Sequence, residues 1–272
     1  HPVDYRYLTW IIDNFSSEQA TFIKPKVSLL TPSNYNKASR KKLNIGKVFQ
    51  NVFRLTAGFD NLVESEIMHD GYGVIIEGDP GLGKTTCLHR QILNRAKKIV
   101  TGEENLPRIP VYIAISDYRG DVPFFEFFKN NLDRSFRYSS FLSQDVDEYL
   151  AQGRLLIFLD DNTNQGQDSQ KRFEEIVSFT KKHKDNFFVI ASRPNSQLGK
   201  FGFVHYRLNP FSGRDARKLL GKILDKSQLR QAKNIIEHIP GAYFWLTTNP
   251  NMLWILARTV QLSEKTPKNR TE

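Results

Sequence analysis

The sequence contains almost no cysteine and no long apolar run. Its single cysteine, Cys87, excludes an internal disulfide framework, suits a reducing compartment and is interpreted as a small buried residue, not as a nucleophile. No uninterrupted apolar stretch approaches the ~18 residues needed to span a bilayer, and the N-terminus HPVDYRYLTW lacks the charged head and apolar block of a secretory signal. We therefore expect a cytoplasmic protein without a membrane segment. Because the chain starts at His1 and not at Met, we also expect it to be part of a longer one.

The composition is that of a globular protein with an excess of basic residues. Hydrophobic residues make up 39% and charged residues 25% of the 272 residues, which suits one or two folded domains. The net charge of +10 is compatible with binding to nucleic-acid phosphates. The basic residues are spread along the chain, however, and the densest cluster, residues 37–47, has no stacking aromatic before Phe49 and Phe53. Solvated basic faces are the preferred interpretation, and direct nucleic-acid binding is the alternative.

Apolar runs recur between residues 72 and 208 and alternate with longer helical patterns. Near-continuous apolar runs are typical of strands that are buried on both faces of a parallel sheet. The predicted strands are residues 72–78, 108–116, 154–160, 186–192 and, more weakly, 203–208. Their alternation with helices predicts a three-layer α/β/α domain with a parallel sheet.

The patterns divide the chain into three parts. Residues 1–47 are expected to form a flanking helix and linker, residues 48–210 the α/β domain, and residues 211–272 a small helical subdomain, because helical patterns replace strands after Pro210. The first part contains one amphipathic helical pattern, with apolar residues at Tyr7, Leu8, Ile11, Ile12 and Phe15.

A glycine-rich loop follows the first predicted strand. The stretch GDPGLGKTT satisfies G-x-x-x-x-G-K-[ST] at Gly78, Gly83, Lys84 and Thr85. Glycines let successive backbone N–H groups turn inward around phosphates, and the following helix presents its positive N-terminus to the same anion. We expect Lys84 to bridge the β- and γ-phosphates, Thr85 to bind Mg²⁺ and Thr86 to reach the α-phosphate. The predicted nucleotide-binding residues of the loop are Gly78, Asp79, Pro80, Gly81, Leu82, Gly83, Lys84, Thr85 and Thr86.

Two adjacent carboxylates end the apolar run LLIFLDD. We expect Asp160 to lie at the carboxyl end of a strand neighbouring the loop's strand, where it would hold Mg²⁺ through water. Asp161 is the candidate catalytic acid, because hydrolysis requires a group that positions or deprotonates a water in line with the γ-phosphate. Arg193, at the tip of the next apolar strand, is placed to read the γ-phosphate. Lys84, Asp161 and Arg193 together form the predicted catalytic set.

These motifs together resemble the STAND class of signal-transduction NTPases, most closely its NACHT branch. The matching stretches, in order, are GDPGLGKTT, LLIFLDD, VIASRP, LNPFSGRDARKLL and TTNPNMLWIL, and the resemblance covers about residues 48–260. It implies an AAA+-like P-loop domain in which Lys84 binds phosphate and Arg193 binds the γ-phosphate. In the same domain, Thr85 and Asp160 would bind magnesium. It also implies that Pro250 packs against adenine, and that KVFQNVFRL, residues 47–55, lines the other side of the base.

One departure concerns the residues after Asp161. NACHT segments usually continue D-G-x-D-E, whereas here the chain reads Asp161, Asn162, Thr163 and Asn164, so the distal acids are absent. The compact Asp-Asp is more similar to the related NB-ARC branch. Hydrolysis therefore either uses Asp161 or is very slow.

The resemblance implies a molecular switch that holds ATP or ADP with Mg²⁺, hydrolyses ATP slowly, self-associates and activates a fused effector in innate immunity, cell death or antiphage defence. Two alternatives remain. A motor-type AAA+ ATPase would need a second sensor arginine, for which Arg214, Arg217, Arg230 and Arg258 are candidates. A nucleic-acid-binding adaptor would use the loop only structurally.

Overall fold

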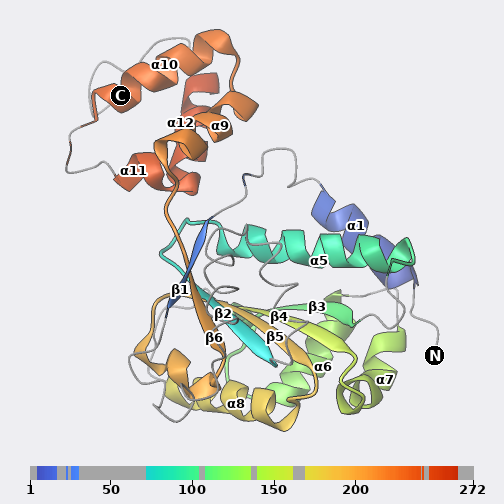
Figure 1. The fold of residues 1–272 in the computed structure, drawn as a ribbon. Helices are drawn as coiled ribbons and strands as arrows, with labels where there is room; N and C mark the ends of the chain where they lie inside the picture. The colour runs from blue at the N-terminus through green and yellow to red at the C-terminus, as the bar shows by residue number, and fades with distance from the viewer. Residues whose placement is uncertain are drawn as a thin grey trace, which may run out of the picture.

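A computed structural model describes residues 5–16, 23, 26–30, 72–103, 108–135, 140–161, 169–239, 241 and 245–262. Within these ranges, six strands form one sheet in the order β1-β6-β2-β5-β4-β3 (Figure 1). The strands are β1 (Val27–Leu30), β2 (Gly73–Glu77), β3 (Ile109–Ala114), β4 (Leu155–Asp160), β5 (Phe187–Ser192) and β6 (Val204–Leu208). All neighbouring strands are parallel except β1 and β6.

The central strands form because their residues are apolar on both faces. Every residue of β2, β4 and β5 is buried, which is the arrangement expected for parallel strands covered by helices on both sides. All five predicted strands are confirmed, with slightly narrower bounds than the sequence indicates. Because the strands are parallel, β2, β4 and β5 deliver the residues that follow them to one edge of the sheet.

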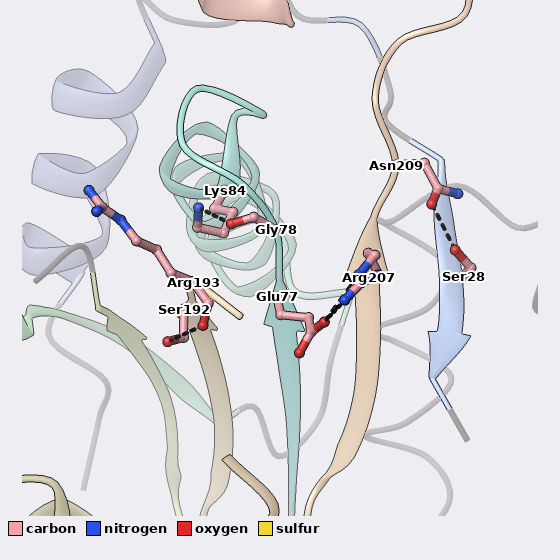
Figure 2. A network of polar contacts seen from close by, with 8 residues as sticks. All are labelled: Ser28, Glu77, Gly78, Lys84, Ser192, Arg193, Arg207 and Asn209. Atoms are coloured by element: carbon pink, nitrogen blue, oxygen red, sulfur yellow. Dashed lines mark hydrogen bonds and ion pairs between the residues drawn. The ribbon is translucent and has the colours of Figure 1, made fainter. Parts of the chain in front are cut away.

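Strand β1 is an addition that the sequence did not predict. It lies in the segment expected to be helix and linker, and it pairs antiparallel with β6. Val27 is buried in the core, and Asn209 N–H donates to the Lys26 carbonyl at 2.9 Å. Ser28 Oγ lies 2.7 Å from Asn209 Oδ1 (Figure 2). The residues VSLL do not alternate strictly between apolar and polar, so the sequence pattern of a half-buried strand is missing here.

Helices cover both faces of the sheet and produce the predicted three layers. One face carries α1 (Tyr5–Phe15) and α5 (Lys84–Val100), which pack against each other. The other carries α6 (Phe124–Ser135), α7 (Ser140–Ala151) and α8 (Ser169–Lys182), as Figure 1 shows. Two short 3₁₀ helices, η2 (Ile115–Asp117) and η3 (Ser196–Phe201), follow β3 and β5. In α1, Tyr7, Leu8 and Ile11 are buried, as the amphipathic pattern predicts.

A second group of helices follows β6. It comprises α9 (Gly213–Ile223), α10 (Lys226–Glu237), α11 (Trp245–Thr248) and α12 (Pro250–Leu262) (Figure 1). These helices have their own buried hydrophobic cluster. Capping boxes begin α9 and α10: the Ser212 and Asp225 side chains accept from the backbone N–H three residues on, which satisfies donors that a helix start leaves unpaired. In the described part of the chain, no helix is long and apolar enough to cross a membrane.

A buried asparagine joins three elements at the amino edge of the sheet. Asn186 is fully buried, its Oδ1 accepts from Leu155 N–H at 3.0 Å, and its Nδ2 donates to the Leu150 carbonyl at 2.8 Å. These bonds connect the start of β4, the end of α7 and the turn before β5. A buried polar group that loses its partner costs the full desolvation of the orphaned group.

We expect Asn186→Ala to lower the free energy of unfolding by about 1–3 kcal/mol, because it orphans the Leu155 N–H and removes one of two donors from the Leu150 carbonyl, which keeps the Gly153 N–H at 3.3 Å. Urea denaturation measures the change. Asn130→Ala, at an exposed position on α6, is the matched control and should stay within about 0.5 kcal/mol of wild type. Equal losses in the two variants would contradict the role assigned to Asn186.

Candidate functional site

The glycine-rich loop joins β2 to α5 in the geometry that the motif predicts. Gly81 and Gly83 have φ of 79° and 89°, a left-handed conformation that side chains resist. Gly83 caps α5, and its carbonyl accepts from Cys87 N–H at 3.0 Å. Gly78 N–H donates to the Ser192 carbonyl of β5 at 3.2 Å. The loop is therefore fixed at both ends, by the helix it starts and by the neighbouring strand.

The remaining loop residues differ in exposure. Asp79 and Pro80 are exposed, Leu82 is buried, and Thr86 is half-buried in the first turn of α5. Cys87 is buried, as predicted.

Lys84 is a buried cation within the loop. The residue is 4% exposed, and its Nζ donates to the Gly78 carbonyl at 2.8 Å (Figure 2). Nζ also donates to the Asp79 carbonyl at 3.2 Å. Burial lowers the pKa of Lys84, while the negative charge of Asp160 acts in the opposite direction. The hydrogen bonds of Lys84 Nζ among the described residues go to neutral carbonyls, and a phosphate oxygen would supply a charged acceptor.

Thr85 contacts Asp160 directly. Thr85 Oγ1 donates to Asp160 Oδ2 at 2.6 Å, and Asp160 is 3% exposed at the end of β4. The prediction that the strand of Asp160 adjoins the loop's strand is wrong, because β5 lies between β2 and β4. The contact forms nonetheless because α5 crosses the sheet and packs against both β5 and β4. Tyr112 of β3 also donates to Asp160 Oδ2, at 3.1 Å.

These residues fit a magnesium ion. Asp160 Oδ1 is buried and has no hydrogen-bond partner among the described residues, and a buried carboxylate oxygen requires a donor or a cation. No cluster of three or more His, Cys, Asp or Glu suited to a metal occurs in the described ranges. Magnesium at nucleotide sites typically uses only one or two protein oxygens together with phosphates and water, so Thr85 and Asp160 are a sufficient protein set.

Asp161 and Arg193 lie on either side of a strand-end serine. Ser192 Oγ is 3.1 Å from the Arg193 carbonyl (Figure 2). It is also 3.1 Å from Asp161 Oδ2, so it can donate to one of them at a time. Asp161 N–H donates to the Ala191 carbonyl at 2.8 Å. Both Asp161 and Arg193 are half-buried. Burial is the largest cause of the lowered pKa of Lys84, and the positive charge of Arg193 lowers this pKa further. The two cations therefore lie near each other.

An ion pair under the loop was missed in the sequence. Glu77, the last residue of β2, is buried, and its Oε1 accepts from Arg207 Nη2 at 2.6 Å and Nε at 3.1 Å (Figure 2). It joins β2 to β6 immediately before the loop. No spacing in the sequence relates these residues, because the pairing depends on the order of the strands.

The helical subdomain contacts the loop through the start of α12. Asn249 Nδ2 donates to the Pro80 carbonyl at 2.9 Å, and Asn251 N–H donates to the Gly81 carbonyl at 3.2 Å. Asn249 Oδ1 meanwhile caps α12 by accepting from Asn251 N–H at 3.0 Å. A Cβ on Gly81 would lie 2.6 Å from Asn249 Oδ1. Pro250, the predicted adenine contact, is the first residue of α12. The contact of Asn249 with the loop was not predicted from the sequence.

The candidate second-sensor arginines lie on the surface of the helical subdomain. All four of them, Arg214, Arg217, Arg230 and Arg258, are exposed. Arg217 Nε donates to the Gly213 carbonyl at 3.2 Å, and the Arg258 guanidinium lies 5.0 Å from the Trp254 ring centroid. Two predicted features lie outside the described residues: the basic cluster and the base-lining segment, both within residues 37–55. The same holds for Asn162, Thr163 and Asn164.

Three features identify the fold on this mainly parallel sheet: the glycine-rich loop, the buried Lys84 and the Thr85–Asp160 contact. The chain has the fold of a P-loop NTPase. Within the sheet, strand β2, which leads into the phosphate loop, is central, and β4, which ends in Asp160, lies two positions away.

Comparisons with solved structures give distant likenesses. The ORC2 protein of Aeropyrum pernix, in ADPNP–ADP complexes, is 14% identical over 76% of this chain and 61% of that chain, with a TM-score of 0.48. A STAND protein with a tetratricopeptide repeat sensor from Pyrococcus horikoshii is 17% identical over 75% and 30%, with a TM-score of 0.41. The replication initiator DnaA, bound to AMPPCP and single-stranded DNA, is 16% identical over 75% and 60%, with a TM-score of 0.45.

This chain therefore spans less than two thirds of each of these three chains. No protein-family model matches the sequence, and no curated protein matches it. At such identities and TM-scores the likenesses carry no conclusion about activity, and the assignment of the fold rests on the loop and the sheet themselves.

We expect Lys84→Met to abolish nucleotide binding without destabilising the protein on its own, because methionine fills a similar volume and removes a desolvated charge. Thermal unfolding measures both effects. Wild type at a nucleotide concentration of about 100 Kd should gain about 5–10 °C, and Lys84→Met should gain nothing while its unliganded Tm stays within about 2 °C or rises. Lys97→Met, exposed on the same helix, should behave as wild type. A retained nucleotide-dependent shift would contradict the role of Lys84.

We expect Asn249→Ser to loosen the phosphate loop while leaving α12 intact, because serine is an equally good N-cap but lacks the Nδ2 donor for Pro80. Amide hydrogen exchange in residues 79–82 of the nucleotide-free protein should accelerate about 3- to 10-fold, with exchange in α12 unchanged. Asp225→Ser replaces the cap of α10 and serves as the control. Unchanged exchange in the loop would show that the Asn249 contact does not hold it.

Proposed function

We propose that the chain is an ATP/ADP-binding switch module of the STAND type, most similar to the NACHT branch, with slow ATP hydrolysis. The observation that carries this proposal is the pair of hydrogen bonds from Asn249 and Asn251 to the phosphate loop. A nucleotide in that loop would contact the sheet domain, while the loop itself is bonded to the helical subdomain. A switch requires such an element, whose two arrangements respond differently to ATP and ADP.

The loop amides, Lys84 and the start of α5 would bind the phosphates, as their geometry and charge favour anions. Thr85 and Asp160 would hold Mg²⁺, which neutralises phosphate charge when bound. Arg193, near Lys84, would distinguish ATP from ADP by binding the γ-phosphate. Loss of that contact would change the preferred position of the loop and therefore of α12.

Slow hydrolysis follows from the surroundings of Asp161. Its Oδ2 lies within hydrogen-bond distance of Ser192 Oγ, so this oxygen already has a protein donor that would compete with the attacking water. The three residues after it, Asn162–Asn164, contain no acid that could replace it. This composition favours a holding role over the repeated turnover of a motor ATPase.

Adenine specificity, self-association and control of a fused effector in immune, cell-death or antiphage signalling belong to this proposal through the motif resemblance alone. Pro250, at the first position of α12, is next to Asn249 and so lies close to the loop, which supports its role beside the base. Through the loop, a change from ATP to ADP would alter the position of the helical subdomain. Movement of that subdomain would expose or bury an oligomerisation surface.

We expect purified protein to release an adenine nucleotide on denaturation and to turn over ATP well below about 1 s⁻¹, the lower end of ordinary turnover. Asp161→Asn should slow hydrolysis at least about tenfold with ATP affinity little changed, because its charge acts on the attacking water. Asp185→Asn, at an exposed aspartate on the opposite edge of the sheet, is the control. Nucleotide analysis by chromatography and single-turnover hydrolysis are the measurements.

A released guanine nucleotide would overturn the adenine assignment and the role of Pro250. Equal rates for wild type and Asp161→Asn would show that Asp161 is not the catalytic acid. DNA or RNA binding that survives Lys84→Met, in a protein that binds no nucleotide, would favour the adaptor function instead.

A further inference from the structure

An aromatic cluster connects helix α1 to the carboxylate of Asp160. Tyr112 of β3 donates to Asp160 Oδ2 at 3.1 Å, and its ring lies 4.9 Å from that of His89 on α5. Phe15, the last residue of α1, lies 4.5 Å from His89 and 6.3 Å from Tyr112 between ring centroids. Trp10 extends the cluster, 6.2 Å from Phe15. The three rings of Phe15, His89 and Tyr112 are therefore in mutual contact.

Helix α1 is anchored to both elements that supply the site. Its buried residues pack along α5, which carries Lys84 and Thr85. The Tyr7 hydroxyl donates to the Pro110 carbonyl on β3, the strand of Tyr112. A shift of α1 would therefore move the packing that surrounds the Tyr112 ring.

The two oxygens of Asp160 are in different environments. Oδ2 accepts from two hydroxyls, of Thr85 at 2.6 Å and of Tyr112 at 3.1 Å. Oδ1 is buried and has no partner among the described residues. Two donors on one oxygen define the rotation of the carboxylate and leave the other oxygen for a magnesium-bound ligand. With the Tyr112 hydroxyl removed, Thr85 would be the one remaining hydrogen-bond donor to Asp160 within the described part of the chain.

We propose that Tyr112 is a positioning residue for Asp160, and that α1 sets its position through Phe15, so that docking of α1 and binding of Mg²⁺–nucleotide are coupled. This inference rests on the proposed nucleotide-binding function and assigns a regulatory element to the same site. Coupling between two binding equilibria is reciprocal: Mg²⁺–nucleotide stabilises the docked helix, and a poorly packed helix weakens Mg²⁺–nucleotide binding. Nucleotide without the metal does not require Asp160 and is not coupled to α1.

The test is ADP affinity of Tyr112→Phe, measured by calorimetry with Mg²⁺ and with EDTA. The variant keeps the ring and removes only the hydroxyl, so we expect the Kd with Mg²⁺ to rise about 3- to 10-fold, the size of one ordinary hydrogen bond. The Kd in EDTA should stay within about twofold, which also shows that the variant is folded. Tyr72→Phe is the matched control, because that hydroxyl donates to the Phe201 carbonyl at 3.3 Å, at the amino edge of the sheet.

The second measurement is backbone hydrogen exchange of α1. Adding Mg²⁺–ADP to wild type should slow exchange in residues 7–15, and Tyr112→Phe should lose that protection. Phe15→Leu, which keeps an apolar side chain but removes the ring contact, should weaken Mg²⁺–ADP binding in the same direction as Tyr112→Phe, again without effect in EDTA.

The outcomes separate the two proposals. Wild-type protein that binds no nucleotide would overturn the proposed function, and this inference with it. Wild-type binding together with an unchanged ratio of Mg²⁺ to EDTA affinity in Tyr112→Phe would overturn this inference alone. A weakened Mg²⁺ affinity in Tyr112→Phe with α1 protection retained would show that Tyr112 positions Asp160 without coupling to the helix, which contradicts the proposal as stated.

Discussion

The hydrogen bond between Thr85 and Asp160 is the contact on which the rest of the site depends. It joins residues 75 positions apart in the sequence, the first turn of α5 and the end of β4. Because β5 lies between β2 and β4, the bond forms only if α5 crosses the sheet at the correct angle and β5 is inserted in register. Lys84, in the first turn of the same helix, donates to the loop carbonyls, and the parallel pairing of β4 with β5 brings Ser192 beside Asp161. A single short contact therefore reports the correct assembly of three strands and a helix.

Two helices reach this site from outside the sheet, and they reach different parts of it. The start of α12 is bonded to Pro80 and Gly81, on the phosphate side. Phe15 of α1 contacts Tyr112 and through it Asp160, on the metal side. The predicted phosphate and magnesium positions are thus each adjacent to a helix that lies outside the sheet. The contacts described for these two helices involve no charged side chain, so both helices would act by changing the geometry of groups in the sheet domain.

The local parts of this arrangement could be predicted from the sequence, and the long-range parts could not. Runs such as LLIFLD and FFVIAS identify buried strands because every side chain must be apolar when both faces are covered. The loop is identified because its glycines and lysine serve one backbone geometry. Strand order, by contrast, leaves no mark on local pattern, and the expected adjacency of β2 and β4 was wrong for that reason. Strand β1, Asn249 and Tyr112 were missed because each acquires its role from a partner far away in the sequence.

Tyr112 illustrates why such residues are difficult to recognise. In the run IPVYIA it reads as one more apolar strand residue, and its ring does pack in that way, against His89 and Phe15. Only its hydroxyl, at the end of a rigid ring, extends to Asp160. An amphipathic side chain can satisfy a packing position and a polar site together, so apolar patterning conceals the polar role. The position of Asp160 consequently depends on packing at the end of a helix that precedes the whole nucleotide-binding fold in the sequence.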